Sequence, residues 1–153
     1  MKNNNNNFYA NYLTVIMIFV GISGCFSVLF GAWFAHAGVN MPNEVQSRLA
    51  HALQYQFFHT LVLFSVAIFL QLLTRKHCAA KVINILYLSA SFFIVGILLF
   101  SGVLYIKTFF DFTTIGKIVP FGGISFALGW LCISWAGINR TVHNSSTDQD
   151  RFR

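Results

Sequence analysis

Polar side chains that could do chemistry are few in this sequence, and they lie near one end of each long apolar stretch. A histidine imidazole can take up or release a proton near neutral pH, and it can also ligate a metal. Hydroxyl and amide groups donate and accept hydrogen bonds, as a site for a small solute requires. If the apolar stretches pack side by side, these groups meet at one depth. The predicted polar cluster contains His36, Tyr55, Gln56, His59, Ser101 and Tyr105.

Motifs for common catalytic and metal sites are absent from the sequence. There is no Gly-x-Ser-x-Gly elbow, no phosphate-binding loop and no helical HExxH zinc motif. His51 and His59 would stand about 12 Å apart along a helix, so they could not share one ion. The three cysteines are scattered and form no CxxC pair, which disfavours a disulfide framework and a structural zinc site. We therefore predict no catalytic residue, no metal ligand and no cofactor.

The scarcity of charge indicates the environment that must hold these groups. Of 153 residues, ten are Lys or Arg and four are Asp or Glu, so 9% are charged. An ordinary soluble domain has about 25%. A soluble globule could not cover its surface with so few charges, and a disordered chain needs the opposite balance of charge and hydrophobicity. Both classes are excluded, and the lipid bilayer is the predicted surrounding of the chain.

The charges divide the chain into four uncharged stretches, each longer than the roughly 20 residues that cross a hydrocarbon core of about 30 Å. The predicted fold class is all-α, an integral membrane four-helix bundle with up-down-up-down topology and short loops. In this topology, the ends of helices one and three and the starts of helices two and four lie at the same membrane face. The predicted helices cover residues 12–35, 55–73, 82–106 and 120–138.

Two polar tails flank this single domain, which is predicted to span residues 12–140. Residues 1–11 contain a run of asparagines with no capacity to pack, so we predict a disordered tail. Residues 141–153 are polar and mixed in charge, and we predict a cytoplasmic tail. Before the second predicted helix, residues 43–54 are consistent with an amphipathic interfacial helix, a question that the sequence leaves open.

Orientation follows from the Lys and Arg residues in the short flanks of the helices. Most of them are at the two termini and in the loop between helices two and three, so both termini are predicted to be cytoplasmic. The polar cluster then lies at the extracytoplasmic ends of the helices. The net charge of +6 favours contact with anionic lipid head groups. Nothing in the sequence suggests nucleic acid as a partner, and homo-oligomer formation stays open.

Small residues recur at spacings of three and four in the first and last predicted helices. Such stripes let membrane helices approach closely, which favours packing over a glycine-lined pore because large apolar residues fill the positions between. The predicted packing glycines are Gly24, Gly31, Gly102, Gly122, Gly123 and Gly129.

Two of these motifs carry a resemblance to a known family. The first is Pro120-x-Gly122-Gly123-x-x-Phe126-x-x-Gly129-Trp130, and the second is Tyr55-Gln56-x-x-His59. From about residue 13 to residue 139 the chain resembles the YgdD-like small bacterial inner-membrane proteins, domain of unknown function 423. These are similar to the eukaryotic transmembrane-protein-256 group. The resemblance implies four membrane helices and a bacterial inner (plasma) membrane location, and it implies no activity.

The chain departs from the pattern of this family at two positions. Phe34 stands where a second glycine is usual, which puts close packing there in question. Val103 replaces a usual serine, which removes one hydroxyl from the polar cluster.

Three functions remain open for the cluster. The first is a non-enzymatic structural or accessory role, in which the polar groups form an interhelical hydrogen-bond network. The second is small-solute or proton transport with His59 as the titrating group, although no acidic residue lies inside any predicted helix. The third is haem or metal binding by His36 and His59. We predict the first, and with it a protein that is not an enzyme.

Overall fold

The computed structural model describes the backbone of residues 2–75, 80–110 and 113–151, and side chains within 9–74, 80–110 and 115–139. Every element in these ranges is a helix. Four helical segments are long and apolar enough to cross a membrane, which confirms the predicted all-α four-helix membrane bundle. The segments are Tyr9–Asn40, Asn43–Thr74, Ala80–Phe110 and Ile115–Asn139.

The first two spans are long, continuous helices joined by a tight connection. Helix α1 covers Lys2–Ala37, the short 3-10 helix η1 covers Gly38–Asn40, and α2 covers Asn43–Arg75. Residues 43–54 are therefore the beginning of α2, without a break before the span. Leu49 and Ala52 in this part are fully buried, so it packs as part of the bundle.

The third span contains three consecutive elements, where the sequence predicts one regular helix. Helix α3 covers Ala80–Gly96, the π-helix η2 covers Ile97–Gly102, and α4 covers Val103–Phe110. The hydrogen bonds of a π-helix join residues five apart instead of four, and such segments frequently occur at functional sites. The fourth span follows the 3-10 helix η3, Thr113–Ile118, and consists of α5, Val119–Arg151.

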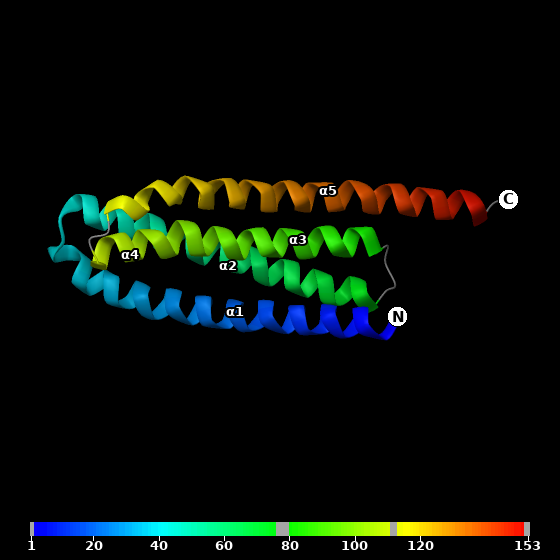
Figure 1. Ribbon diagram of the computed structural model, residues 1–153, viewed down its shortest axis with the longest axis horizontal. Helices are drawn as coiled ribbons and strands as arrows, with labels where there is room; N and C mark the ends of the chain where they lie inside the picture. The colour runs from blue at the N-terminus through cyan, green and yellow to red at the C-terminus, as the bar shows by residue number, and fades with distance from the viewer. Residues whose placement is uncertain (1, 76–79, 111–112, 152–153) are drawn as a thin grey trace.

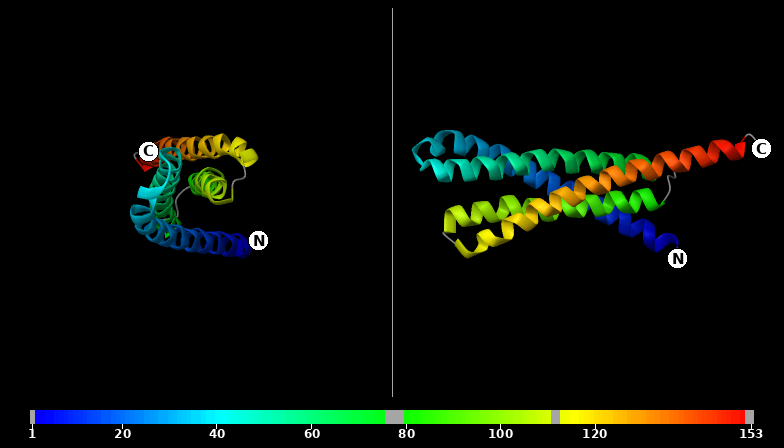
Figure 2. Two further views of the ribbon diagram at one scale, coloured as in Figure 1. Left: turned by 90° about the vertical axis from the view of Figure 1, so that its left-hand side faces the viewer. Right: turned by 90° about the horizontal axis from the view of Figure 1, so that it is seen from above.

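The helices alternate in direction, as the topology predicts. The ends of α1 and α4 lie beside the starts of α2 and α5 at one end of the bundle (Figure 1). The two chain termini lie towards the opposite end (Figure 1). Seen along its length, the bundle has α3 in the centre, with α1, α2 and α5 on three sides of it (Figure 2). Helices α1 and α5 run obliquely to the nearly parallel α2 and α3 (Figure 2).

Helices α1 and α5 extend into the segments predicted as tails. Helix α1 begins at Lys2 and includes the asparagine run, and α5 continues to Arg151. Both extensions continue a helix that the membrane span already forms, and adding a residue to an existing helix is far easier than starting a new one. The side chains of these extensions lie outside the described residues.

The apolar core lies between α3 and its three neighbours. Its completely buried members include Ile16, Leu63, Leu70 and Phe93, which come from α1, α2 and α3. Many large apolar side chains are exposed on the outside of the bundle, such as Leu61 on α2. That distribution suits a bundle whose outer surface faces lipid hydrocarbon.

Candidate functional site

A buried hydrogen-bond network joins α1 to α2 near the middle of both helices. The Oγ atoms of Ser23 and Thr60 are 2.7 Å apart, in a bond that either hydroxyl can donate. The amide Nε2 of Gln56 donates to the Ser23 Oγ over 3.1 Å and to the Ser23 carbonyl oxygen over 3.3 Å. Ser27 donates to the same carbonyl oxygen over 2.9 Å. The predicted cluster residue Gln56 is therefore part of an interhelical network.

His59 lies on a different side of α2 from this network, among aromatic rings. Its imidazole stacks on the ring of Phe126 from α5, with ring centroids 3.6 Å apart and an interplanar angle of 12°. The ring of Phe93 from α3 is 5.8 Å away. Nδ1 is 2.8 Å from the carbonyl oxygen of Tyr55, and since a carbonyl oxygen only accepts, Nδ1 carries the proton. Only 5% of the residue is exposed, so the imidazole fills a packed space between three helices.

Tyr55 is one turn before His59 on the same face of α2. Its ring stacks on Phe100 of η2, with centroids 4.5 Å apart, and 40% of the residue is exposed. A hollow of about 420 Å³ opens beside this face and is lined by Gln54, Tyr55, Phe58 and His59.

Ser101 and Tyr105 lie one turn apart on the third span. Ser101 is completely buried, and its hydroxyl has no hydrogen-bond partner among the described residues. The hydroxyl of Tyr105 is likewise buried and unpaired there. The Tyr105 ring packs edge-on against Phe30 and Phe26 of α1, with centroids 4.8 Å and 5.4 Å away.

His36 is exposed at the end of α1. Of the six predicted cluster residues, the structure thus places Gln56 in the α1–α2 network and Tyr55 with His59 in an aromatic stack. Ser101 and Tyr105 are buried between helices on the third span. The six residues of the predicted cluster are therefore divided among separate environments. The sequence places them towards the same ends of the helices, but it does not show which helix each side chain faces.

Ser23 and Thr60 are the polar residues of this region that the sequence prediction missed. Ser27 belongs to the stripe of small residues in the first predicted helix, for which the sequence predicts only a packing role. Ser23 lies four residues before it. Thr60 follows His59 directly. The signal that could have found them is the i,i+4 pair of serines on one face of α1. Knowing that this face meets Gln56 requires the rotation of α1 about its axis.

Metal binding has little support in the described part of the chain. Within it there is no group of three or more His, Cys, Asp or Glu side chains that could hold a metal ion. The two histidines proposed as ligands have different surroundings, since His36 is exposed and His59 is packed between Phe126 and the Tyr55 carbonyl.

The predicted packing glycines also have different surroundings. A Cβ built on Gly122 would lie 2.5 Å from the backbone nitrogen of Phe100, and one on Gly129 would lie 3.0 Å from the ring of Phe93. Helix α5 therefore approaches the third span closely at both glycines. At Gly31 and Gly102 a Cβ would meet atoms at 3.4 Å and 3.9 Å, which is ordinary contact. At Gly24 and Gly123 it would meet no atom within 4 Å beyond the helix backbone and adjacent residues, so the expectation of close packing differs from the structure there.

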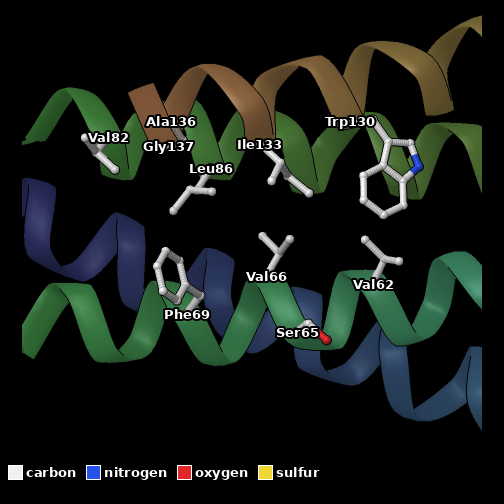
Figure 3. Close-up of a pocket in the computed structure, with 10 residues that line it drawn as sticks. All are labelled: Val62, Ser65, Val66, Phe69, Val82, Leu86, Trp130, Ile133, Ala136 and Gly137. Carbon is white, nitrogen blue, oxygen red and sulfur yellow. The ribbon is translucent and has the colours of Figure 1, made fainter. Parts of the chain in front are cut away.

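An apolar groove of about 520 Å³ lies between α2, α3 and α5 (Figure 3). Its residues Phe69 and Val82 lie near the end of α2 and the start of α3, so the groove lies towards the end of the bundle that holds the termini. Its walls are hydrocarbon and aromatic side chains, with the Ser65 hydroxyl as an exception (Figure 3). That hydroxyl donates to the Leu61 carbonyl oxygen of its own helix over 2.9 Å. The groove suits a hydrocarbon occupant and is separate from the polar residues described above.

Comparison with known proteins shows the family of this chain. The model of the family described as "Protein of unknown function (DUF423)" matches residues 30–123, which is more than half of the chain. The chain belongs to the DUF423 family. The matched segment contains all six residues of the predicted polar cluster, whereas Ser23 lies before it.

Several bacterial relatives support the assignment to DUF423. A protein of Haemophilus influenzae named "UPF0382 membrane protein" is 36% identical over 126 residues, covering 81% of this chain and 90% of the relative. The "UPF0382 inner membrane protein YgdD" of Escherichia coli K12 is 32% identical, covering 75% and 82% respectively. The "UPF0382 membrane protein YwdK" of Bacillus subtilis is 29% identical, covering 82% and 98%. No solved structure matches the chain.

Family membership and the four apolar spans lead to the same conclusion. The chain is a multi-pass membrane protein of the DUF423 family, and no biochemical role is established for this family.

Proposed function

We propose that this DUF423 protein is a non-enzymatic bundle of the bacterial inner membrane with a structural or accessory role. The observation that carries the proposal is that polar side chains inside the spans bind neighbouring helices. Ser23, Gln56 and Thr60 join α1 to α2. The location in the inner membrane rests on the name of the Escherichia coli relative.

The same use of polar groups recurs between the third span and α5. Ser89 of α3 donates to the carbonyl oxygen of Gly129 over 2.8 Å, and Ser125 of α5 donates to the carbonyl oxygen of Phe92 over 2.8 Å. In a membrane, where the surroundings of the helices are as apolar as their side chains, such bonds contribute about 0.6 kcal/mol each on average. A set of them at both interfaces supports a scaffold whose helices keep one arrangement.

Reconstitution into proteoliposomes tests the proposal. We expect the purified protein to produce no proton flux above that of empty vesicles and to show no Soret absorption band. We expect Gln56→Leu to lower the melting temperature in detergent, because it removes the bonds to Ser23. As a control, Ser65→Ala removes only a hydrogen bond within α2 and should leave the melting temperature nearly unchanged. A flux that is abolished by His59→Ala in a protein that still folds would replace the structural role with transport.

Small-solute movement is the second candidate function. It is favoured by one observation, the buried and unpaired side-chain atoms of Gln56, Ser101 and Tyr105. A proton pathway has less support, because no Asp, Glu, Lys or Arg lies between residues 49 and 74 or between 82 and 106.

A further inference from the structure

Three buried polar atoms lack a hydrogen-bond partner among the described residues, and they come from two neighbouring spans. They are Oε1 of Gln56 on α2, Oγ of Ser101 in η2 and the hydroxyl oxygen of Tyr105 on α4. Gln56 is 5% exposed and Ser101 is 0% exposed. A buried polar group without a partner costs about 1–3 kcal/mol, so native proteins almost always supply one, from protein or from ordered water.

The packing of α2 against η2 sets two of these atoms at nearly the same depth. The ring of Tyr55 stacks on the ring of Phe100. Gln56 follows Tyr55, and Ser101 follows Phe100. The two spans run in opposite directions and each step along a helix advances about 1.5 Å, so the levels of Gln56 and Ser101 in the bundle differ by only about 3 Å.

The packing of α1 against the third span gives the same level independently. Tyr12 is hydrogen-bonded to Ser91, and the ring of Tyr105 packs on Phe26 and Phe30, so these pairs join residues 75 to 79 positions apart. This register sets Ser23 level with residues 98–102 of η2, which include Ser101. Ser23 is also the residue that Gln56 binds. Helices α1 and α2 therefore meet the third span at the level of Gln56 and Ser101, and Tyr105 lies one turn further along that span.

The chemistry of the three atoms is complementary to a small uncharged molecule. Nε2 of Gln56 must be the atom near the Ser23 carbonyl oxygen, because that oxygen cannot donate, and Oε1 is left as an acceptor. The hydroxyls of Ser101 and Tyr105 can each donate and accept. Water offers two donors and two acceptors, and buried water typically makes about three bonds to groups of this kind.

We propose that Gln56, Ser101 and Tyr105 form a hydrated site within the membrane domain that binds water. Ser101 lies in the π-helix η2, and π-helical segments frequently occur at functional sites. The site goes beyond the structural role proposed above, because that role uses Nε2 of Gln56 and the hydrated site uses Oε1. It is also distinct from the apolar groove of Figure 3, which lies between α2, α3 and α5.

Cysteine accessibility tests the site directly. Ser101→Cys is placed in a chain that carries Cys25→Ala, Cys78→Ala and Cys132→Ala, and it is reconstituted in vesicles with small, uncharged methyl methanethiosulfonate. The thiolate is the reactive form and requires water, so we expect labelling at least about tenfold faster than at a dry position.

Ser89→Cys in the same background is the matched control. Ser89 is also 0% exposed and lies on the same span, but its hydroxyl is bonded to Gly129. The reagent reaches both positions from the same lipid, so different rates report water at the thiol. Equal rates at the two positions would overturn the proposal.

A stability comparison covers the case in which the cysteine variants fail to fold. In a hydrated site Ser101→Ala removes a bond to water and should lower the melting temperature, as Ser89→Ala does by removing its bond to Gly129. In a dry site Ser101→Ala removes an unpaired buried hydroxyl and should raise the melting temperature. An unchanged or raised melting temperature of Ser101→Ala would therefore contradict the hydrated site. Neither experiment touches Ser23 or Thr60, so its failure would leave the structural role standing.

Discussion

Gln56 has different surroundings at the two ends of its side-chain amide. Nε2 is bonded to Ser23 of α1, and Oε1 is buried without a partner among the described residues. A change at this residue therefore affects both the joining of two helices and the hydrated site. Variants at Ser23 and Ser101 test the two roles separately, because Ser23 takes part in the α1–α2 network and Ser101 does not.

Gly122 is the single residue at which a small change should be most damaging. A Cβ there would lie 2.5 Å from the backbone nitrogen of Phe100, and a backbone atom cannot move aside as a flexible side chain can. We expect Gly122→Ala to push α5 away from η2 and to reduce the free energy of unfolding by about 1–3 kcal/mol. Thermal unfolding in detergent measures the effect.

Gly123→Ala is the matched control, since the next residue of the same helix has no heavy atom within 4 Å of the added Cβ beyond the helix backbone and adjacent residues. Alanine is a better helix former than glycine, so this variant should be about as stable as the wild type or up to about 1 kcal/mol more stable. If both variants unfolded at the same temperature, the close approach of α5 to η2 would be refuted.

At the scale of helices, the sequence predicts that there are four spans, but not which face each span turns to its neighbours. Residues such as Glu44, Lys81 and Lys107 lie near the ends of apolar stretches, and the predicted helices 55–73 and 82–106 lie inside the longer spans Asn43–Thr74 and Ala80–Phe110. The π-helix at Ile97–Gly102 was missed, because apolar residues on all sides give no period to read. The pairing of Ser23 with Thr60 was missed because it depends on packing between distant segments.

Deletion of one residue distinguishes the π-helix from a regular helix. Leu98 lies within η2 and is exposed on the outside of the bundle. Because each hydrogen bond of a π-helix encloses one residue more than that of an α-helix, removing Leu98 should restore a regular helix without rotating α4. We expect this variant to fold with Tyr105 still packed on Phe30, and to lose the labelling of Ser101→Cys. Circular dichroism melts and thiol labelling report the two effects.

Deletion of Leu88 is the control for this experiment. Leu88 is also exposed but lies in the regular helix α3, where removing a residue rotates the following side chains by about 100°. Phe93, which is completely buried, would then leave the core. We expect the protein to lose its cooperative unfolding. Equal tolerance of both deletions would show that η2 is no different from the rest of the span.

At the scale of the whole molecule, the topology brings the ends of α1 and α4 and the starts of α2 and α5 to one end of the bundle (Figure 1). The sequence predicts this arrangement because four spans joined by short connections must alternate. Gln56 and Ser101 lie in the half of the bundle nearer this end, His59 lies at the middle of α2, and the apolar groove lies mainly in the other half. The direction of the bundle in the membrane decides which compartment each half faces.

The distribution of Lys and Arg predicts that direction. Lys81 at the start of α3 and Arg75 at the end of α2 lie at the end of the bundle that holds both termini, and Arg140, Arg151 and Arg153 follow the fourth span. Short loops that are rich in these residues stay in the cytoplasm. We expect a green fluorescent protein fused after Arg153 to fluoresce, and alkaline phosphatase at the same position to be inactive. Alkaline phosphatase fused after Phe110, at the other end of the third span, should be active. The reverse pattern would place the termini outside the cytoplasm, and the half of the bundle with Gln56 and Ser101 would then face the cytoplasm.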